Sequence, residues 1–135
     1  MYSAGDCIHI QTNHYPNGIP KFHLFVVILD AKNEDSKTIL IPICSIEPGV
    51  YFDNTTVLEV GDHNFIKQSS FADYYYALLL STKIIDQMIS EDKARKISKG
   101  VDIIILEKIK SGVMKSEHTK IGVQEFYEDS LYNSF

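Results

Sequence analysis

The stretch from Gly61-Asp62-His63 to Ser69-Ser70-Phe71 holds the residue types in this chain that are best suited to chemistry. Histidine gains and loses a proton near neutral pH, so His63 is a candidate acid or base. A carboxylate can orient an imidazole, but an aspartate that follows a glycine more often closes a turn through its side chain. The stretch therefore predicts a loop that frames a site, with Asp62 closing the turn.

The remaining histidines and the cysteines do not form a pattern typical of a metal centre. His9, His14 and His118 lack a mutual spacing that would place them around one ion, and no acid and histidine cluster accompanies them. Cys7 and Cys44 each lie inside an apolar run, where a reduced thiol behaves as a small hydrophobic group. The sequence predicts no metal site, no disulfide framework and no cofactor.

Length and composition indicate one globular domain that spans residues 1–135. The chain is 44% hydrophobic and 23% charged, which suits a single buried core. Its formal net charge is −5 and Arg95 is its only arginine, which argues against general affinity for nucleic acids. No apolar run approaches a membrane span, and the amino terminus lacks a signal pattern. We expect a cytoplasmic protein with no membrane partner.

Runs of β-branched and aromatic residues predict four strands in the first half of the chain. The second of them is apolar on both faces, as in a central strand, and Pro42 marks an edge, a bulge or a bend in the third. A polar loop rich in turn formers follows the first strand at residues 12–20. The expected strands are residues 6–11, 22–29, 38–46 and 57–60.

The second half of the chain predicts mostly helices. Ser70-Phe71-Ala72-Asp73 resembles a capping box, and the three tyrosines after it cannot share one helix face, so at least one belongs to the core. Residues 82–89 fit a strand or a helix, and we favour the strand. Helices are expected at about residues 91–99 and over residues 101–110, ending before Gly112. Residues 115–135 form a polar tail that is expected to dock loosely or to need a partner.

This order of elements resembles the PemK/MazF-like toxin superfamily, small bacterial proteins with an SH3-like β-barrel and a carboxy-terminal helix. Gly5-Asp6-Cys7-Ile8 resembles the opening glycine and aspartate of that family, which a strand follows. Residues 22–29 are similar to its buried, valine-rich strand, and Ile41-Pro42-Ile43-Cys44-Ser45 resembles its third strand, which ends in a hydroxyl residue. Ser69 and Ser70 fall near a serine that leads into its later strands. The resemblance implies a mainly β fold with α, an SH3-like barrel with C-terminal helices.

The resemblance also implies an activity, partners and site residues. It implies a metal-independent endoribonuclease of a bacterial toxin-antitoxin system that cleaves single-stranded RNA as a homodimer and is restrained by an antitoxin protein. In the family a basic side chain and a serine or threonine lie at the scissile phosphate. Those roles fall here on His23, with Lys21 beside it, and on Ser45. The family's arginine is absent at this position, and histidine can carry protons but cannot act as a fixed guanidinium clamp.

Cleavage of RNA without a metal needs a base for the 2′-hydroxyl, an acid for the leaving oxygen and donors for the phosphorane charge. His23 and His63 are the hypothetical proton pair, provided that the loop after the fourth strand folds over the second. Ser45 and the amides before Phe71 would hold phosphate. The candidate site thus has His23, Ser45 and His63 as catalytic residues and Lys21, Asp62, Ser69 and Ser70 as substrate-binding residues.

Two functional hypotheses remain open at the level of sequence. The first is the endoribonuclease described above. The second is a non-catalytic SH3-like barrel that binds a protein or peptide partner in a defence or toxin-antitoxin system, and it is motivated by the acidic balance and the missing arginine. Each histidine also has a plain structural interpretation, in which His23 caps a strand end and His63 bonds a turn.

Overall fold

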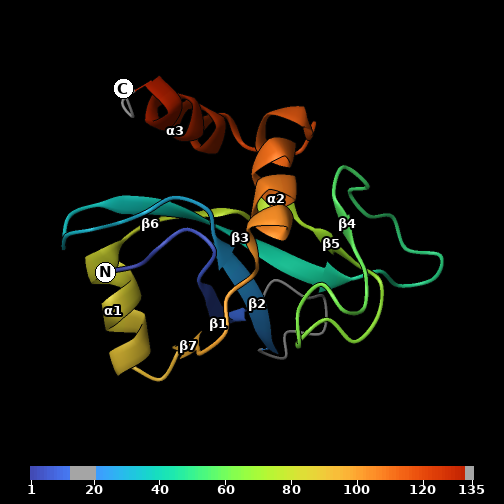
Figure 1. Cartoon of the computed structure of the whole chain (residues 1–135), viewed down its shortest axis with the longest axis horizontal. Helices are drawn as coiled ribbons and strands as arrows, with labels where there is room; N and C mark the ends of the chain where they lie inside the picture. Colours follow the sequence, from blue (N-terminus) through green and yellow to red (C-terminus); the bar gives the residue numbers. More distant parts are fainter. Residues whose placement is uncertain (13–20, 133–135) are drawn as a thin grey trace.

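The computed structural model of the protein describes residues 1–12 and 21–132, so most of the predicted loop at 12–20 lies outside the described residues. The described chain forms an antiparallel sheet with helices on both faces (Figure 1). The strands are β1 (Cys7–Thr12), β2 (Lys21–Val27), β3 (Lys37–Ser45), β4 (Val57–Leu58), β5 (Ser70–Ala72), β6 (Leu78–Ser81) and β7 (Ala94–Ile97). The helices are α1 (Thr82–Ser90), α2 (Ile103–Lys115), α3 (Ile121–Tyr132) and a short 3₁₀ turn at Tyr74–Tyr76.

The sheet is built around β2, as its apolar sequence predicted. β2 lies between β1 and β3, with His9 paired to Leu24 on one side and Leu24 paired to Ile43 on the other. The full order is β4-β5-β3-β2-β1-β7, and β6 joins β3. A mainly β fold with α is therefore confirmed. The barrel is not, because among the described strands the two ends of the sheet do not close on each other.

The outer side of β3 changes its neighbour near Pro42. Lys37 to Leu40 pair with β6, whereas Ile43 to Ser45 pair with β5. The carbonyl of Pro42 accepts a hydrogen bond from the amide of Asp73 at 2.9 Å, at the point where the chain leaves β5. Proline has no backbone N–H and cannot donate a hydrogen bond to a neighbouring strand. The interval between the residues that pair with β6 and those that pair with β5 therefore accommodates Pro42 within a central strand.

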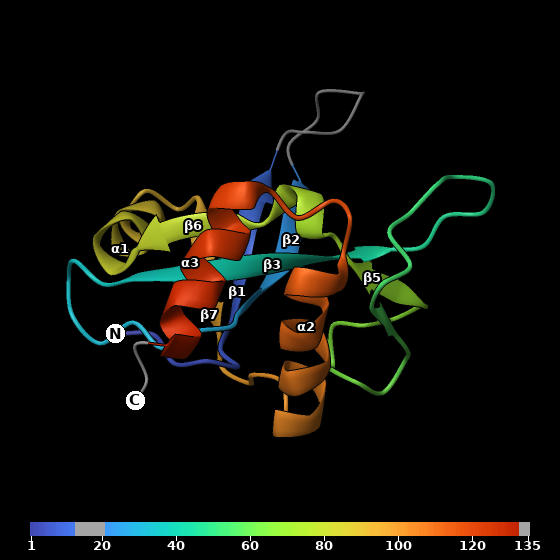
Figure 2. The same cartoon turned by 90° about the horizontal axis from the view of Figure 1, so that it is seen from above.

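Each face of the sheet has its own core, because successive strand residues point to opposite sides. Cys7, Val26 and Ile41 share one face and pack with α2 and α3. Ile8, Ile10, Phe25, Val27 and Leu40 lie on the other and pack with Ile85 of α1. The figures show α1 on one side of the sheet and α2 with α3 on the other (Figures 1 and 2).

Two predictions for residues 82–99 are wrong. Residues 82–89 form helix α1 instead of a strand, and Ser81 caps it by accepting a hydrogen bond from the amide of Ile84 at 3.3 Å. The helix predicted at 91–99 is instead the turn after α1 and strand β7, which pairs with β1. β1 would otherwise leave a row of backbone groups without partners, and its pairing outweighs the helical preference of the segment.

Two helix boundaries also differ from prediction. Ser70 does not begin a helix but begins β5, which pairs with β3, and its hydroxyl donates to the carbonyl of Gln68 at 2.8 Å. The predicted helix at 101–110 is confirmed as α2, but it continues through Gly112 to Lys115. Tyr74 is fully buried, which confirms that at least one of the three tyrosines belongs to the core.

The predicted polar tail contains helix α3. Its Val123 and Tyr127 are buried in the core that α2 covers, whereas Ile121 and Tyr132 are exposed. None of the helices in the described part of the chain is long and apolar enough to cross a bilayer.

Candidate functional site

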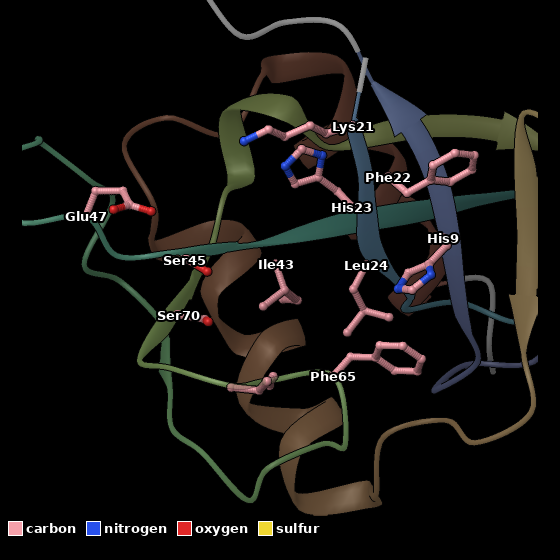
Figure 3. A pocket seen from close by; sticks show the side chains of 11 residues that line it. His9, Lys21, Phe22, His23, Leu24, Ile43, Ser45, Glu47, Phe65 and Ser70 are labelled. Atoms are coloured by element: carbon pink, nitrogen blue, oxygen red, sulfur yellow. The ribbon is translucent and has the colours of Figure 1, made fainter. Parts of the chain in front are cut away.

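A cavity of about 340 Å³ opens where β1, β2, β3 and β5 meet the segment before β5 (Figure 3). Four of the seven predicted site residues contribute to it, namely Lys21, His23, Ser45 and Ser70. The others that line it are His9, Phe22, Leu24, Ile43, Glu47, Phe65 and Ile66. The chain thus brings the beginning of β2 and the end of β3 to one place, where the family resemblance puts His23 and Ser45.

His23 and Ser45 nevertheless leave the sheet from opposite faces. Leu24 and Ile43 are direct partners across β2 and β3 and share a face, so Ser45, two residues beyond Ile43, shares it as well. His23 precedes Leu24 and therefore points to the other side, as does Cys44. Figure 3 shows His23 and Lys21 on one side of β3, with Ile43 and Leu24 directed to the opposite side. Both residues contribute to the cavity, but their side chains leave the strands toward opposite faces of the sheet.

The ring of His23 is engaged on its own face. Its Nδ1 lies 2.8 Å from the Oγ1 of Thr12, on the neighbouring strand β1. The side chain of His23 is half-buried, whereas that of Lys21 is exposed. This arrangement holds the imidazole beside the end of β1, across the sheet from the Ser45 hydroxyl.

His63 has a structural role in the turn before β5. Its Nδ1 accepts a hydrogen bond from the amide of Phe65 at 3.2 Å, so its Nε2 carries the proton and donates to the carbonyl of Lys99 at 2.7 Å. The side chain is 4% exposed and does not line the cavity. With both ring nitrogens bonded to the backbone, His63 does not form the predicted proton pair with His23.

Asp62 and Ser69 also stabilise this turn. The carboxylate of Asp62 accepts from the amide of Glu59 at 2.8 Å, which confirms the turn-closing interpretation. The hydroxyl of Ser69 donates to the carboxylate of Glu59 at 2.6 Å. Neither residue lines the cavity, whereas Ser70, the next residue along, lies directly opposite Ser45 across β5 and β3.

The sequence did not single out His9 and Phe65 for this site. His9 lies on β1 between Leu24 and Arg95, and its ring meets the ring of Phe65 edge-on, with centroids 4.6 Å apart. Its Nδ1 is buried and has no hydrogen-bond partner among the described residues. Burial lowers the pKa of His9 below its ordinary value, and electrostatic interactions with Arg95 and with His63 lower it further. The alternation of side chains along the first strand places His9 on the same face as Cys7, and this pattern could have identified His9 from the sequence.

The cavity therefore combines an apolar floor with a polar rim. Leu24, Ile43 and Ile66 are buried and form the floor, and the rim carries the Ser45 hydroxyl and the Glu47 carboxylate. Such a cavity can hold a group with an apolar body and a polar edge. Among the described residues, no group of three or more His, Cys, Asp or Glu side chains is placed to hold a metal ion.

Comparison of the chain with protein-family models, with curated proteins and with solved structures found no match.

Proposed function

We propose that this protein is a non-catalytic binding module whose cavity between β2, β3 and β5 takes an apolar or aromatic side chain of a protein or peptide partner. The observation that carries the proposal is the bonding of both His63 ring nitrogens to the backbone, together with the placement of His23 and Ser45 on opposite faces of the sheet. The predicted acid and base are His23 and His63, and His63 neither lines the cavity nor has a ring nitrogen without a backbone partner.

The size and lining of the cavity support a binding role. A volume of about 340 Å³ lies at the lower end of the range for ligand pockets, and the buried aliphatic floor would remove the apolar surface of a partner side chain from water. Partner side chains that fill such pockets contribute most of the binding energy of an interface. Ser45 and Ser70 face each other at the rim, where the hydroxyl of Ser45 is exposed and could bond the backbone of a partner.

The test uses peptides selected from a random display library against the wild-type protein, with affinities measured by calorimetry. Ser45→Trp would fill the cavity from its rim, and we expect it to weaken the selected peptides by at least about tenfold. Ser69→Trp is the matched control, because Ser69 is also an exposed serine but lies outside the cavity. Equal affinity for both variants would contradict the placement of the partner in this cavity.

The second candidate is the toxin-like endoribonuclease, acting as a homodimer and restrained by an antitoxin. One observation favours it: Lys21, His23, Ser45 and Ser70 all contribute to the same cavity. The two proposals differ in a simple measurement, namely the degradation of single-stranded RNA in the presence of a chelator by wild type, His23→Ala and Ser45→Ala. The binding module predicts intact RNA with all three proteins and normal growth during induced expression. Cleavage by wild type that both variants abolish would overturn it in favour of the ribonuclease.

A further inference from the structure

A second cavity, of about 190 Å³, lies on the other side of β5. Ser70 lines the first cavity and its neighbour Phe71 lines the second, because adjacent strand residues point to opposite faces. The second cavity is lined by His118 and by four aromatic residues and two aspartates, which we call the aromatic cage: Tyr51, Phe52, Phe71, Tyr75, Asp53 and Asp73. None of them was singled out for a function by the sequence, and the proposed peptide site does not use them.

The rings of the cage are held in place although they face solvent. Tyr51 is 78% exposed, yet its hydroxyl is hydrogen-bonded to the Nε2 of His118 at 2.7 Å, and the two rings meet edge-on at 5.8 Å. Phe52 packs on Phe71 with ring centroids 5.4 Å apart. An exposed aromatic side chain that is already fixed loses little conformational entropy when a ligand binds against it.

Asp53 supplies a fixed negative charge at the base of the cage. It is 6% exposed, and its Oδ2 accepts from the hydroxyl of Ser116 at 2.5 Å. Its Oδ1 accepts from both the amide and the hydroxyl of Thr55, at 3.0 and 2.6 Å. Burial alone would raise the pKa of Asp53, but the bonds from Ser116 and Thr55 and the nearby His118 bring it below its ordinary value. The carboxylate is therefore ionised at neutral pH.

The structure already places one cation against the cage. The Nζ of Lys120 lies 4.9 Å from the centroid of the Tyr75 ring, although Lys120 does not line the cavity. Among the described residues, no lysine or arginine lies within ion-pair distance of Asp53. Within the described residues Asp53 thus forms no ion pair with a lysine or an arginine, and the basic side chain that acts on it is His118, which also lines the cavity.

We propose that the aromatic cage binds an alkylammonium group, either a lysine side chain of a partner protein or a free amine. The faces of aromatic rings carry negative potential and attract ammonium groups, most strongly where water is excluded. The oxygens of Asp53 already accept three hydrogen bonds, so the carboxylate acts as a charge and does not offer the free bidentate edge that a guanidinium prefers. A compact ammonium fits this combination and this volume.

The experiment is a titration of the ¹⁵N-labelled full chain with candidate ligands. Binding is measured by the NMR shifts of the backbone amides around the cage and by calorimetry. The probes are choline, its neutral tert-butyl isostere, and short peptides that contain one lysine with or without three Nζ-methyl groups. Choline is expected to shift amides around Tyr51, Phe71 and Tyr75, and the neutral isostere is not. Tighter binding of a lysine peptide than of choline identifies a protein partner as the source, and the reverse order identifies a free amine.

Variants test whether the added cation binds in this cavity and whether the cage binds more than this chain's own Lys120. Tyr75→Leu is expected to weaken binding of the cation by about tenfold, and Tyr132→Leu, at an exposed aromatic residue that lines neither cavity, is the matched control with no effect. Lys120→Met removes the internal cation and is expected to leave affinity equal or higher. If choline bound the Lys120→Met variant but not the wild type, the cage would bind only the side chain of Lys120, and the proposal would be overturned. Equal binding of choline and its isostere, or no shift of the cage amides by any probe, would overturn it as well.

Discussion

His23 and Ser45 lie on neighbouring strands near the same end of the sheet, yet their side chains point to opposite faces. The resemblance that selected them follows position along the chain, and a position alone does not say which face a side chain occupies. Because successive side chains of a strand alternate between the two faces, a shift of one residue moves a side chain to the other face. Cys44, which precedes Ser45, shares the face of His23 and carries a thiol where the predicted site needs a hydroxyl.

His9 is the histidine for which the structure makes a definite prediction about pH. Its pKa in the folded protein lies below the value of about 6.5 that it has when unfolded. The unfolded chain therefore binds the proton more readily, so this contribution to stability is complete above about pH 6.5 and is lost as the pH falls below it.

We expect His9→Gln, which does not titrate, to flatten the decline of stability between about pH 7 and pH 5. Urea denaturation of wild type and variant at several pH values in this window measures the effect. Parallel curves for the two proteins would show that His9 does not contribute to the pH dependence.

Elements in the first half of the chain were predicted more accurately than those in the second. The strands at 6–11, 22–29 and 38–46 correspond to β1, β2 and β3, because long runs of β-branched and aromatic residues leave few alternatives. Residues 82–89 were predicted as a strand but form helix α1, and residues 91–99 were predicted as a helix but contain strand β7. Both segments are short and amphipathic, and pairing of β7 with the edge of β1 decided their structure.

Gly112 shows why α2 does not end where its sequence suggested. A Cβ at this position would overlap the hydroxyl of Tyr74, which donates to the carbonyl of Ile109 at 2.6 Å and lies 2.8 Å from Thr56 Oγ1. The glycine therefore lets the helix approach the sheet closely and does not mark its end. The glycine is required by a tertiary contact, so its presence did not indicate the end of the helix as the local sequence suggested.

We expect Gly112→Ala to lower the free energy of unfolding by about 2 kcal/mol, because overpacking outweighs the better helix propensity of alanine. Gly122→Ala is the matched control, since a Cβ there meets nothing within 4 Å, and it should raise stability by up to about 1 kcal/mol. Urea denaturation measures both. A stabilising Gly112→Ala would contradict the close approach of α2 to Tyr74.

At the scale of the whole molecule, α3 completes the core on one face of the sheet. Val123 and Tyr127 are buried with residues of α2 and β2, although the sequence of the tail reads as polar. Val123 and Tyr127 lie on the side of the helix that faces the core, whereas Ile121, Leu131 and Tyr132 are exposed.

We expect Tyr127→Ala to lower the free energy of unfolding by about 3 kcal/mol through loss of buried aromatic surface. Tyr132→Ala, on the same helix but 70% exposed, should change it by less than about 0.5 kcal/mol. Both values come from urea denaturation of the full chain. Similar small effects for the two variants would show that α3 is only loosely docked.

The sequence by itself determined the strand-rich first half and the central position of β2. Those features follow from local patterns of apolar residues and from the order of antiparallel strands. Only the tertiary structure decided which face each side chain occupies, that His63 bonds the backbone, that the described strands form an open sheet, and that aromatic residues from three segments line one cavity with Asp53. Register, edge pairing and contacts between distant segments set these features, and no local pattern encodes them.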